Sequence, residues 1–285
     1  MLRRYIAEQP TSRLAVWARR TALFSLIATI LAIIIVRSGL LEFRPALATV
    51  GGALAFSAIA LLLAFAAFVV IWRDGLMGIG YSLTAIGIGV ALLAYPSYVA
   101  VASYRLPWIY DITTDPIDPP RFEALARIRP RDANPIIYAG LSAAEQQRNA
   151  YPEIETLEQE ATAQLSYDAA LAVVTKRKWN IVARRPPERG REGRIEAVAR
   201  TPIMGLREDV VIRVRSDGQG SRLDMRSSSR YGSFDFGTNA ARVRNLIDDI
   251  DDAVGRQKPE QPVSAAAKKA KGPPAKGAQP QPRNR

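Results

Sequence analysis

The chain contains neither cysteine nor histidine among its 285 residues. This composition excludes disulfides, thiol chemistry, Ser–His and Cys–His nucleophilic sites and histidine-ligated zinc. A catalytic site would have to use carboxylates, a Ser–Lys pair or arginine electrostatics. The segment 106–255 has only two lysines, Lys176 and Lys178. The composition therefore disfavours an enzyme, and we predict no cofactor and no metal site.

Charged residues are also missing from three long apolar runs, Ala22–Val36, Ala46–Trp72 and Leu76–Tyr104. A bilayer core about 30 Å thick requires about 20 apolar residues in a helix, and the second and third runs exceed that length. The first run reaches it when the flanking Trp17–Arg20 and Arg37 extend to the interface. Because two further runs follow it directly, we interpret the first run as a retained helix and not as a cleaved signal peptide. Residues 22–105 are therefore predicted to form a three-helix transmembrane anchor.

The orientation of this anchor follows from the arginines that precede it. Residues 1–21 form a basic N-terminus that contains five arginines, and positive residues stay on the cytoplasmic side. Three crossings then place the C-terminal domain on the opposite side of the membrane from the N-terminus. Membrane lipids are the first expected partner. Small residues in the runs are expected to let the helices approach closely; they are Gly51, Gly52, Ala55, Gly80, Gly87 and Gly89.

The net charge of +12 is concentrated at the two ends of the chain. Residues 1–21 carry +4 and residues 256–285 carry +7, whereas residues 106–255 carry −1. A folded domain with balanced charge and no recognisable RNA- or DNA-binding motif does not indicate a nucleic-acid partner. The segment 256–285 is rich in Ala, Lys, Pro and Gly and is predicted to be a disordered basic tail.

The soluble part is predicted to belong to the α+β class. Residues 106–150 are rich in Pro and Asp and are predicted to be an extended lead-out, with at most a short helix at 122–128. A helix is expected from an N-cap at Ser166 to about Arg177. Four strands at 179–183, 194–200, 209–215 and 222–228 and a closing helix at 238–254 follow from the apolar periodicity. The full prediction is three N-terminal transmembrane helices, then a four-stranded antiparallel sheet flanked by two helices.

One face of the predicted sheet is polar, and its interpretation stays open. The face carries Arg194, Glu196, Arg200, Arg213, Arg215, Asp224 and Arg226. It is either a solvated face with ion pairs across the strands or an anion-recognising surface, since the arginine fork suits phosphate and carboxylate. The arginine-rich loop 184–191 allows the same two readings. The carboxylates of Asp248, Asp249, Asp251 and Asp252 lie at the negative end of the closing helix and predict a cationic partner such as Arg256 or Lys258.

The segment Arg226–Arg242, with the sequence RSSSRYGSFDFGTNAAR, resembles the signature of the DUF1499 family. Tyr151-Pro152, Thr201-Pro202 and the strands at 179–182 and 209–213 fit the same pattern. The resemblance covers about residues 145–255, and on that basis we place a DUF1499-like α+β domain at 151–255. It is similar to bacterial family members in which the domain follows several membrane spans. This resemblance implies that the membrane is a bacterial inner membrane, and we expect the domain on its periplasmic side. The family has no assigned biochemistry, so the resemblance implies no catalytic residue.

The same signature contains the candidate site. We expect Arg226, Arg230, Asp235, Asn239 and Arg242 to lie together where a strand leads into the closing helix, with Asn239 as a cap of that helix. Arginines beside the free N–H groups of a helix start suit an anion. The alternative is a buried capping network that fixes the strand to the helix.

Three functions fit the sequence. The first is a binding or accessory module that recognises an anionic lipid, a glycan or an envelope protein. The second is an enzyme that acts on a phosphorylated or lipid-linked substrate through Arg and Asp. The third is a structural subunit of a membrane complex. The sequence does not predict an oligomeric state.

Overall fold

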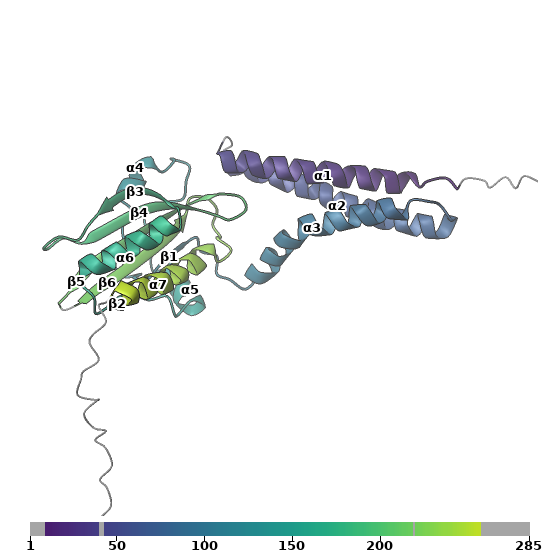
Figure 1. The fold of residues 1–285 in the computed structure, drawn as a ribbon. Helices are drawn as coiled ribbons and strands as arrows, with labels where there is room; N and C mark the ends of the chain where they lie inside the picture. Colours follow the sequence, from purple (N-terminus) through teal and green to yellow (C-terminus); the bar gives the residue numbers. More distant parts are fainter. Residues whose placement is uncertain (1–8, 40–42, 219, 258–285) are drawn as a thin grey trace, which may run out of the picture.

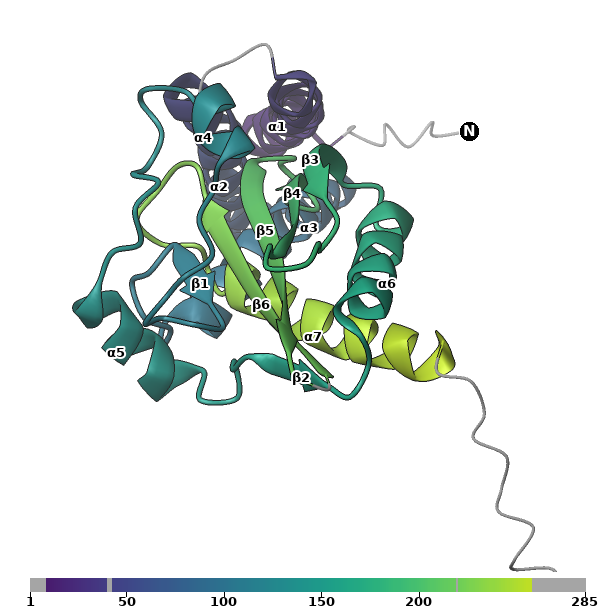
Figure 2. The same cartoon turned by 90° about the vertical axis from the view of Figure 1, so that its left-hand side faces the viewer.

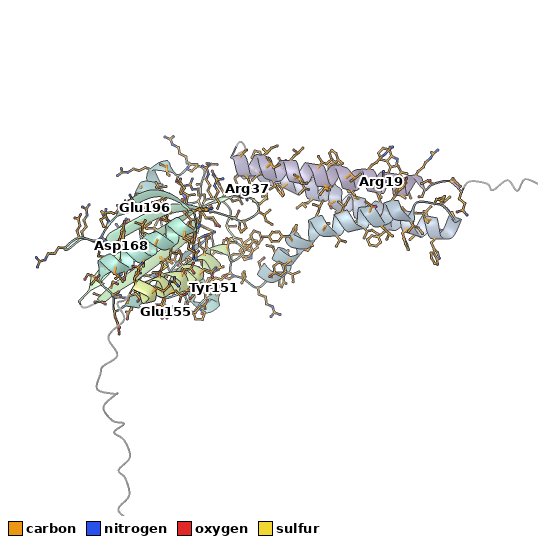
Figure 3. All side chains as sticks on the ribbon, in the orientation of Figure 1. Arg19, Arg37, Tyr151, Glu155, Asp168 and Glu196 are labelled. Atoms are coloured by element: carbon orange, nitrogen blue, oxygen red, sulfur yellow. The ribbon has the colours of Figure 1, made fainter. Side chains whose placement is uncertain are left out.

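Three long helices precede a mixed α+β domain in the computed structural model, which describes residues 9–39, 43–218 and 220–257. The helices are α1 (Arg13–Ser38), α2 (Phe43–Asp74) and α3 (Ile79–Ser103). Each is long and apolar enough to cross a membrane, which confirms the three candidate spans. Figure 1 shows them as a bundle that extends from one end of the domain. Arg19 and Arg37 lie toward opposite ends of α1, with Arg37 beside the domain (Figure 3).

Alanine forms most of the contact between the helices. The buried alanines between the helices include Ala18, Ala22, Ala60, Ala64 and Ala85. Of the five glycines expected to allow close approach, Gly89 does so, because an added Cβ there would lie 2.5 Å from Leu61 Cγ. At the other four, no atom outside the helix's own turns lies within 4 Å of the Cβ position. The expectation was wrong for those four, since the helices meet on their alanine faces.

The domain is built on one antiparallel sheet of six strands in the order β1-β6-β5-β4-β3, with β2 paired to β6. The strands are β1 (Asp111–Thr113), β2 (Leu157–Gln159), β3 (Asn180–Arg185), β4 (Gly193–Arg200), β5 (Arg207–Asp217) and β6 (Gly220–Ser229). The four predicted strands correspond to β3 to β6. The predicted number was wrong because β1 and β2 have three residues each, too few for an alternating pattern to be recognised.

Helices α6 (Ala163–Lys176) and α7 (Thr238–Gln257) cover one face of the sheet (Figure 1). The sheet residues buried beneath them include Ile195, Ala197, Val210, Ile212, Val214, Leu223 and Met225. The N-cap of α6 is Thr162, whose Oγ1 accepts a hydrogen bond from Leu165 N at 3.3 Å. The predicted cap, Ser166, lies inside the helix and is 2.7 Å from Ser221 Oγ, because the helix starts one turn earlier than its apolar pattern.

The opposite, polar face of the sheet is covered and not solvated. Figure 2 shows α4 (Ala124–Ile128) and α5 (Leu141–Ala150) on the side of the sheet away from α6 and α7. Phe122 and Leu125 pack with Val198 and Val211 in a second, smaller core on this side. The segment 106–150 is therefore not an extended lead-out, because its apolar residues and its aspartates both find partners on the sheet.

Helix α5 holds the short edge strand β1 in place. Gln147 is buried, and its Oε1 accepts from Thr113 N at 3.0 Å while its Nε2 donates to Thr113 O at 2.7 Å. The amide thus pairs with the backbone of β1 as another strand would. One glutamine on a polar helix gave no signal of this role in the sequence.

The acidic end of α7 finds partners within the fold. Asp249 pairs with Arg177 at 2.6 Å, and Asp251 accepts from Gln159 at 2.6 Å. Asp252 lies 3.9 Å from Arg256, as expected, while Lys258 falls outside the described residues.

The domain is docked on the ends of α1 and α2. Arg37 Nη1 donates to the carbonyl oxygens of Pro202 and Ile203 at 2.6 and 3.0 Å. Met204 and Leu206, from the same β4–β5 loop, pack on an apolar cluster formed by α1 and α2. The ends of β4 and β5 that flank this loop therefore form the end of the sheet that faces the helix bundle.

Candidate functional site

Arg226 is fully engaged inside the domain. Its Nε and Nη2 donate to the two carboxylate oxygens of Asp111 at 2.9 and 2.6 Å. The guanidinium also donates to Pro120 O at 3.2 Å and to Ile136 O at 2.7 Å. Because Arg226 and Asp111 both have side chains 2% exposed, this pair is a buried structural element and is not available to a ligand.

Other charges of the same face are paired in the same way. Asp224 accepts from Arg213 Nη2 at 2.9 Å and from Arg215 Nη2 at 2.8 Å. Asp115 and Asp118 approach both arginines from the covering segment. Burial lowers the pKa of Arg213, but Asp224 and its neighbours more than reverse this and leave the pKa raised.

These carboxylates do not form a metal site. They converge on arginines, and the described part of the chain contains no group of three acidic side chains placed to hold a metal ion. Glu196 has a different partner, because its carboxylate accepts the backbone N–H groups of Glu123, Ala124 and Leu125 at 3.0, 3.1 and 2.8 Å. It therefore caps the start of α4 from the sheet.

Asp235, Asn239 and Arg242 form a second network at the start of α7. Asp235 accepts from Gly237 N at 2.9 Å and from Asn239 N at 2.8 Å, so Asp235, and not Asn239, caps the helix. Asn239 is buried and donates to Tyr110 O and to Ser229 Oγ, each at 2.9 Å. Arg242 donates to Asn239 Oδ1 at 2.8 Å and pairs with Glu208. This network joins α7 to β6 and to the residue before β1.

Arg230 belongs to a third group. Its Nε donates to Asp209 Oδ1 at 2.9 Å, and Arg129 Nε lies 3.2 Å from Asp209 Oδ2. The five predicted site residues thus do not converge on one ligand position. Arg226, Asp235, Asn239 and Arg242 lie in buried polar networks, as in the alternative interpretation of the signature. Of the five residues, Arg230 alone lines a cavity.

That cavity has a volume of about 490 Å³ and lies at the end of the sheet that faces the helix bundle. We call it the cationic pocket; its lining residues are Ile128, Arg177, Lys178, Trp179, Asn180, Val198, Arg200, Arg207 and Arg230. Five of them are cationic and none is acidic. Arg207 Nη2 lies 3.4 Å from the Cβ position at Gly39, directly after α1. A second cavity of about 570 Å³ has no such bias, because Glu155, Glu158 and Arg222 all line it.

Two of the five cations in the cationic pocket have carboxylate partners. Arg177 pairs with Asp249 and Arg230 with Asp209. Within the described residues no ion pair engages Lys178, Arg200 or Arg207, and all three are exposed. Arg200 Nη1 donates to Arg37 O at 3.1 Å, which holds its position without neutralising its charge.

Arg200 on β4 and Arg207 on β5 lie directly opposite each other in the sheet. Like charges in directly opposite positions destabilise a sheet. The pair Arg194–Arg213, also directly opposite, has Glu192 near both guanidinium groups, in contact with Arg194 and 4.0 Å from Arg213. Among the residues that the structure describes, no carboxylate does the same for Arg200 and Arg207, so within this part of the chain their positive charge is uncompensated.

Lys178 has an unfavourable backbone conformation, with φ at 55° directly after α6. Glycine is the usual residue at this left-handed position because a side chain is strained there. Lys178 is therefore a backbone outlier that lines the cationic pocket, which makes it a candidate for a functional role.

The fold and the site together define a class, an antiparallel α+β domain attached to three candidate membrane helices. Residues 111–250 match the family described as Protein of unknown function (DUF1499). Residues 111–250 therefore form a DUF1499 domain, as the signature indicates, and the match begins at β1, well before residue 151. No curated protein matches the chain.

Sequence reasoning missed the cationic pocket, although a signal was present. Arg200 ends one predicted strand, and Arg207 lies two residues before the next predicted strand at 209–215; in the structure a loop of six residues separates the two arginines. An antiparallel register through such a loop places the flanking residues opposite each other.

Proposed function

We propose that this chain is an integral membrane protein of the bacterial inner membrane that binds a phosphate-bearing anion in the cationic pocket. In this proposal the DUF1499 domain is a binding or accessory module on the cell-envelope side, with the N-terminus in the cytoplasm. The anion is the headgroup of an anionic lipid or a soluble phosphate compound. The opposed pair Arg200–Arg207 is the observation that carries the proposal, because a bound anion would relieve its repulsion.

The composition of the cationic pocket favours binding over turnover. Its lining has arginines, a lysine and Trp179 but no carboxylate, so it supplies anion contacts without a general base. Its place beside the ends of α1 and α2 favours a ligand at the membrane surface. The arginines at the opposite end of the bundle support the orientation, since positive residues stay cytoplasmic.

Trp179 provides a direct test, because it lines the pocket. The variant Trp17→Phe, Trp72→Phe, Trp108→Phe leaves Trp179 as the sole tryptophan of the full-length chain. We expect its fluorescence to change saturably when the purified protein is titrated with inorganic phosphate in detergent or is placed in nanodiscs containing phosphatidylglycerol. A response to the nanodiscs alone assigns a lipid headgroup, and a response to inorganic phosphate assigns a soluble ligand.

The double variant Lys178→Gln, Arg207→Gln is expected to weaken the affinity at least tenfold, since charged hydrogen bonds of about 1.5 kcal/mol or more each are removed. Arg189→Gln, Arg191→Gln removes the same charge from the exposed β3–β4 loop and is expected to leave the affinity unchanged. The proposal fails if neither anion gives a saturable response, or if the two double variants behave alike.

A further inference from the structure

We propose that Trp108, Phe234 and Phe236 form a membrane-contact surface that inserts into the interfacial layer of the bilayer. We call these three side chains the aromatic cluster. Two of them come from the DUF1499 signature, and the third follows α3. The proposal is independent of the cationic pocket, since none of the three residues lines it.

The aromatic cluster is continuous and open to its surroundings. The rings of Trp108 and Phe234 stack with centroids 5.3 Å apart, and the rings of Phe234 and Phe236 are 4.7 Å apart. Trp108 is 73% exposed and Phe236 is 53% exposed. Three neighbouring aromatic rings that leave this much apolar area uncovered mark a contact surface.

The contacts of the loop 231–237 place it at the level where two helices leave the membrane. Tyr231 stacks on Phe43, the first residue of α2, with ring centroids 4.9 Å apart. Asp235 N donates to Ile109 O at 3.3 Å, six residues after α3 ends at Ser103. Figure 1 shows the end of α3 leading directly into the domain on the side that faces the bundle.

This position identifies the partner as the lipid bilayer. Aromatic side chains gather at the membrane–water interface, where their apolar area leaves water. The described end of α3 continues the same band, with Tyr98 at 69% and Tyr104 at 86% exposure. The aromatic cluster extends this band from the helices onto the domain.

The backbone of the loop supports a functional role. Phe236 has φ at 54° and Gly237 has φ at 77°, a left-handed pair that turns the chain into α7. A glycine at position 236 would adopt this conformation without strain. An exposed phenylalanine in that position is an observed outlier of the kind that accompanies function.

The test uses tryptophan as a depth probe in the full-length protein. All four native tryptophans are replaced by phenylalanine, and a single tryptophan is introduced by Phe236→Trp. The protein is reconstituted in vesicles whose phosphatidylcholine is brominated on the acyl chains. We expect blue-shifted emission and quenching of at least half of the quenching observed for a protein that retains only Trp72, within α2.

The matched negative control is Asp217→Trp in the same background. Asp217 lies at the far end of β5, ten residues from Arg207, or about 33 Å along the strand. Its emission is expected to be unquenched. Quenching at position 236 equal to that at position 217 would overturn the proposal and would indicate that the aromatic cluster faces water or a protein.

A second measurement covers the case in which Phe236→Trp disturbs the loop. A protein that retains only the native Trp108 is compared with the same protein carrying Phe236→Asn, since asparagine tolerates a left-handed backbone. We expect Trp108 to be quenched by the brominated lipid and its quenching to fall at least twofold in the variant. Unquenched Trp108 would contradict the proposal.

Discussion

Asp111 and Arg226 form a two-pronged ion pair between the strand that follows the membrane helices and a central strand of the sheet. The Nε–Oδ1 and Nη2–Oδ2 distances are 2.9 and 2.6 Å, and 115 positions separate the two residues in the sequence. The pair fixes the first residues after the membrane to β6. It explains why the DUF1499 match starts at residue 111: the segment 111–150 completes the domain.

We predict that Asp111→Asn destabilises the domain by about 3–5 kcal/mol, because it leaves Arg226 charged, buried and without its carboxylate. The measurement is denaturant unfolding of the full-length protein in detergent, followed by the fluorescence of Trp179. The double variant Asp111→Leu, Arg226→Met is the control, since an apolar replacement of a buried pair costs less than breaking the pair. A loss below about 1 kcal/mol in Asp111→Asn would contradict the structural role.

We predict that the folded domain loses stability at alkaline pH because of Tyr138. Burial, with a further contribution from Asp111, raises the pKa of Tyr138 to about 12. In the unfolded chain the tyrosine hydroxyl has the usual pKa of about 10, so the unfolded state loses this proton at a lower pH than the folded state. The contribution of Tyr138 to stability is therefore fully present below pH 10 and is lost as the pH rises to 12. Two pKa units correspond to about 3 kcal/mol.

The variant Tyr138→Phe tests this, because the hydroxyl is buried and has no hydrogen-bond partner among the described residues. At pH 7 we expect its stability to remain within about 1 kcal/mol of the wild type or to rise. Between pH 10 and 12 the variant is expected to lose less stability than the wild type in denaturant unfolding. Parallel curves would exclude a role of Tyr138.

Lys178→Gly is expected to separate stability from binding. Glycine relieves the strain at φ 55°, so the thermal stability is expected to be unchanged or to rise by up to about 1 kcal/mol. The affinity for the anion is expected to fall severalfold, because one cation leaves the cationic pocket. An affinity equal to that of the wild type would show that the lysine plays no part in binding.

The absence of cysteine makes the orientation testable with one substitution. Asp217→Cys introduces the sole thiol of the chain at the exposed β5–β6 turn. If the domain is periplasmic, a membrane-impermeant maleimide will label it in intact spheroplasts. Labelling only after lysis would reverse the orientation and would place the cationic pocket on the cytoplasmic surface.

The sequence predicts the local parts of this fold well. Val210, Ile212 and Val214 recur at every second position of β5. That period predicts the strand and the side that packs under α6 and α7, although Val211 between them is apolar as well. The three apolar runs predict the helices, because length and hydropathy suffice. The signature around Arg226–Arg242 identifies the family.

Pairings between distant residues are what the sequence could not predict. The arginines of the polar face indicate charge but not all of its partners. Asp224 lies on the same face, whereas Asp111, Asp115 and Asp118 belong to a covering segment that reaches the sheet only in the folded chain. The same limit applies to the candidate site, where Asp235 replaced Asn239 as the cap of α7. The like-charged pair Arg200–Arg207 could have been predicted, had the register of β4 and β5 been derived from their short loop.

Native mass spectrometry of the full-length protein, released from its own membrane, tests the central claim most directly, because the method needs no prior choice of ligand. The account predicts a bound phosphate-bearing species that is retained by Arg189→Gln, Arg191→Gln and lost from Lys178→Gln, Arg207→Gln. Equal retention by both variants, or no bound species in the wild type, would contradict it.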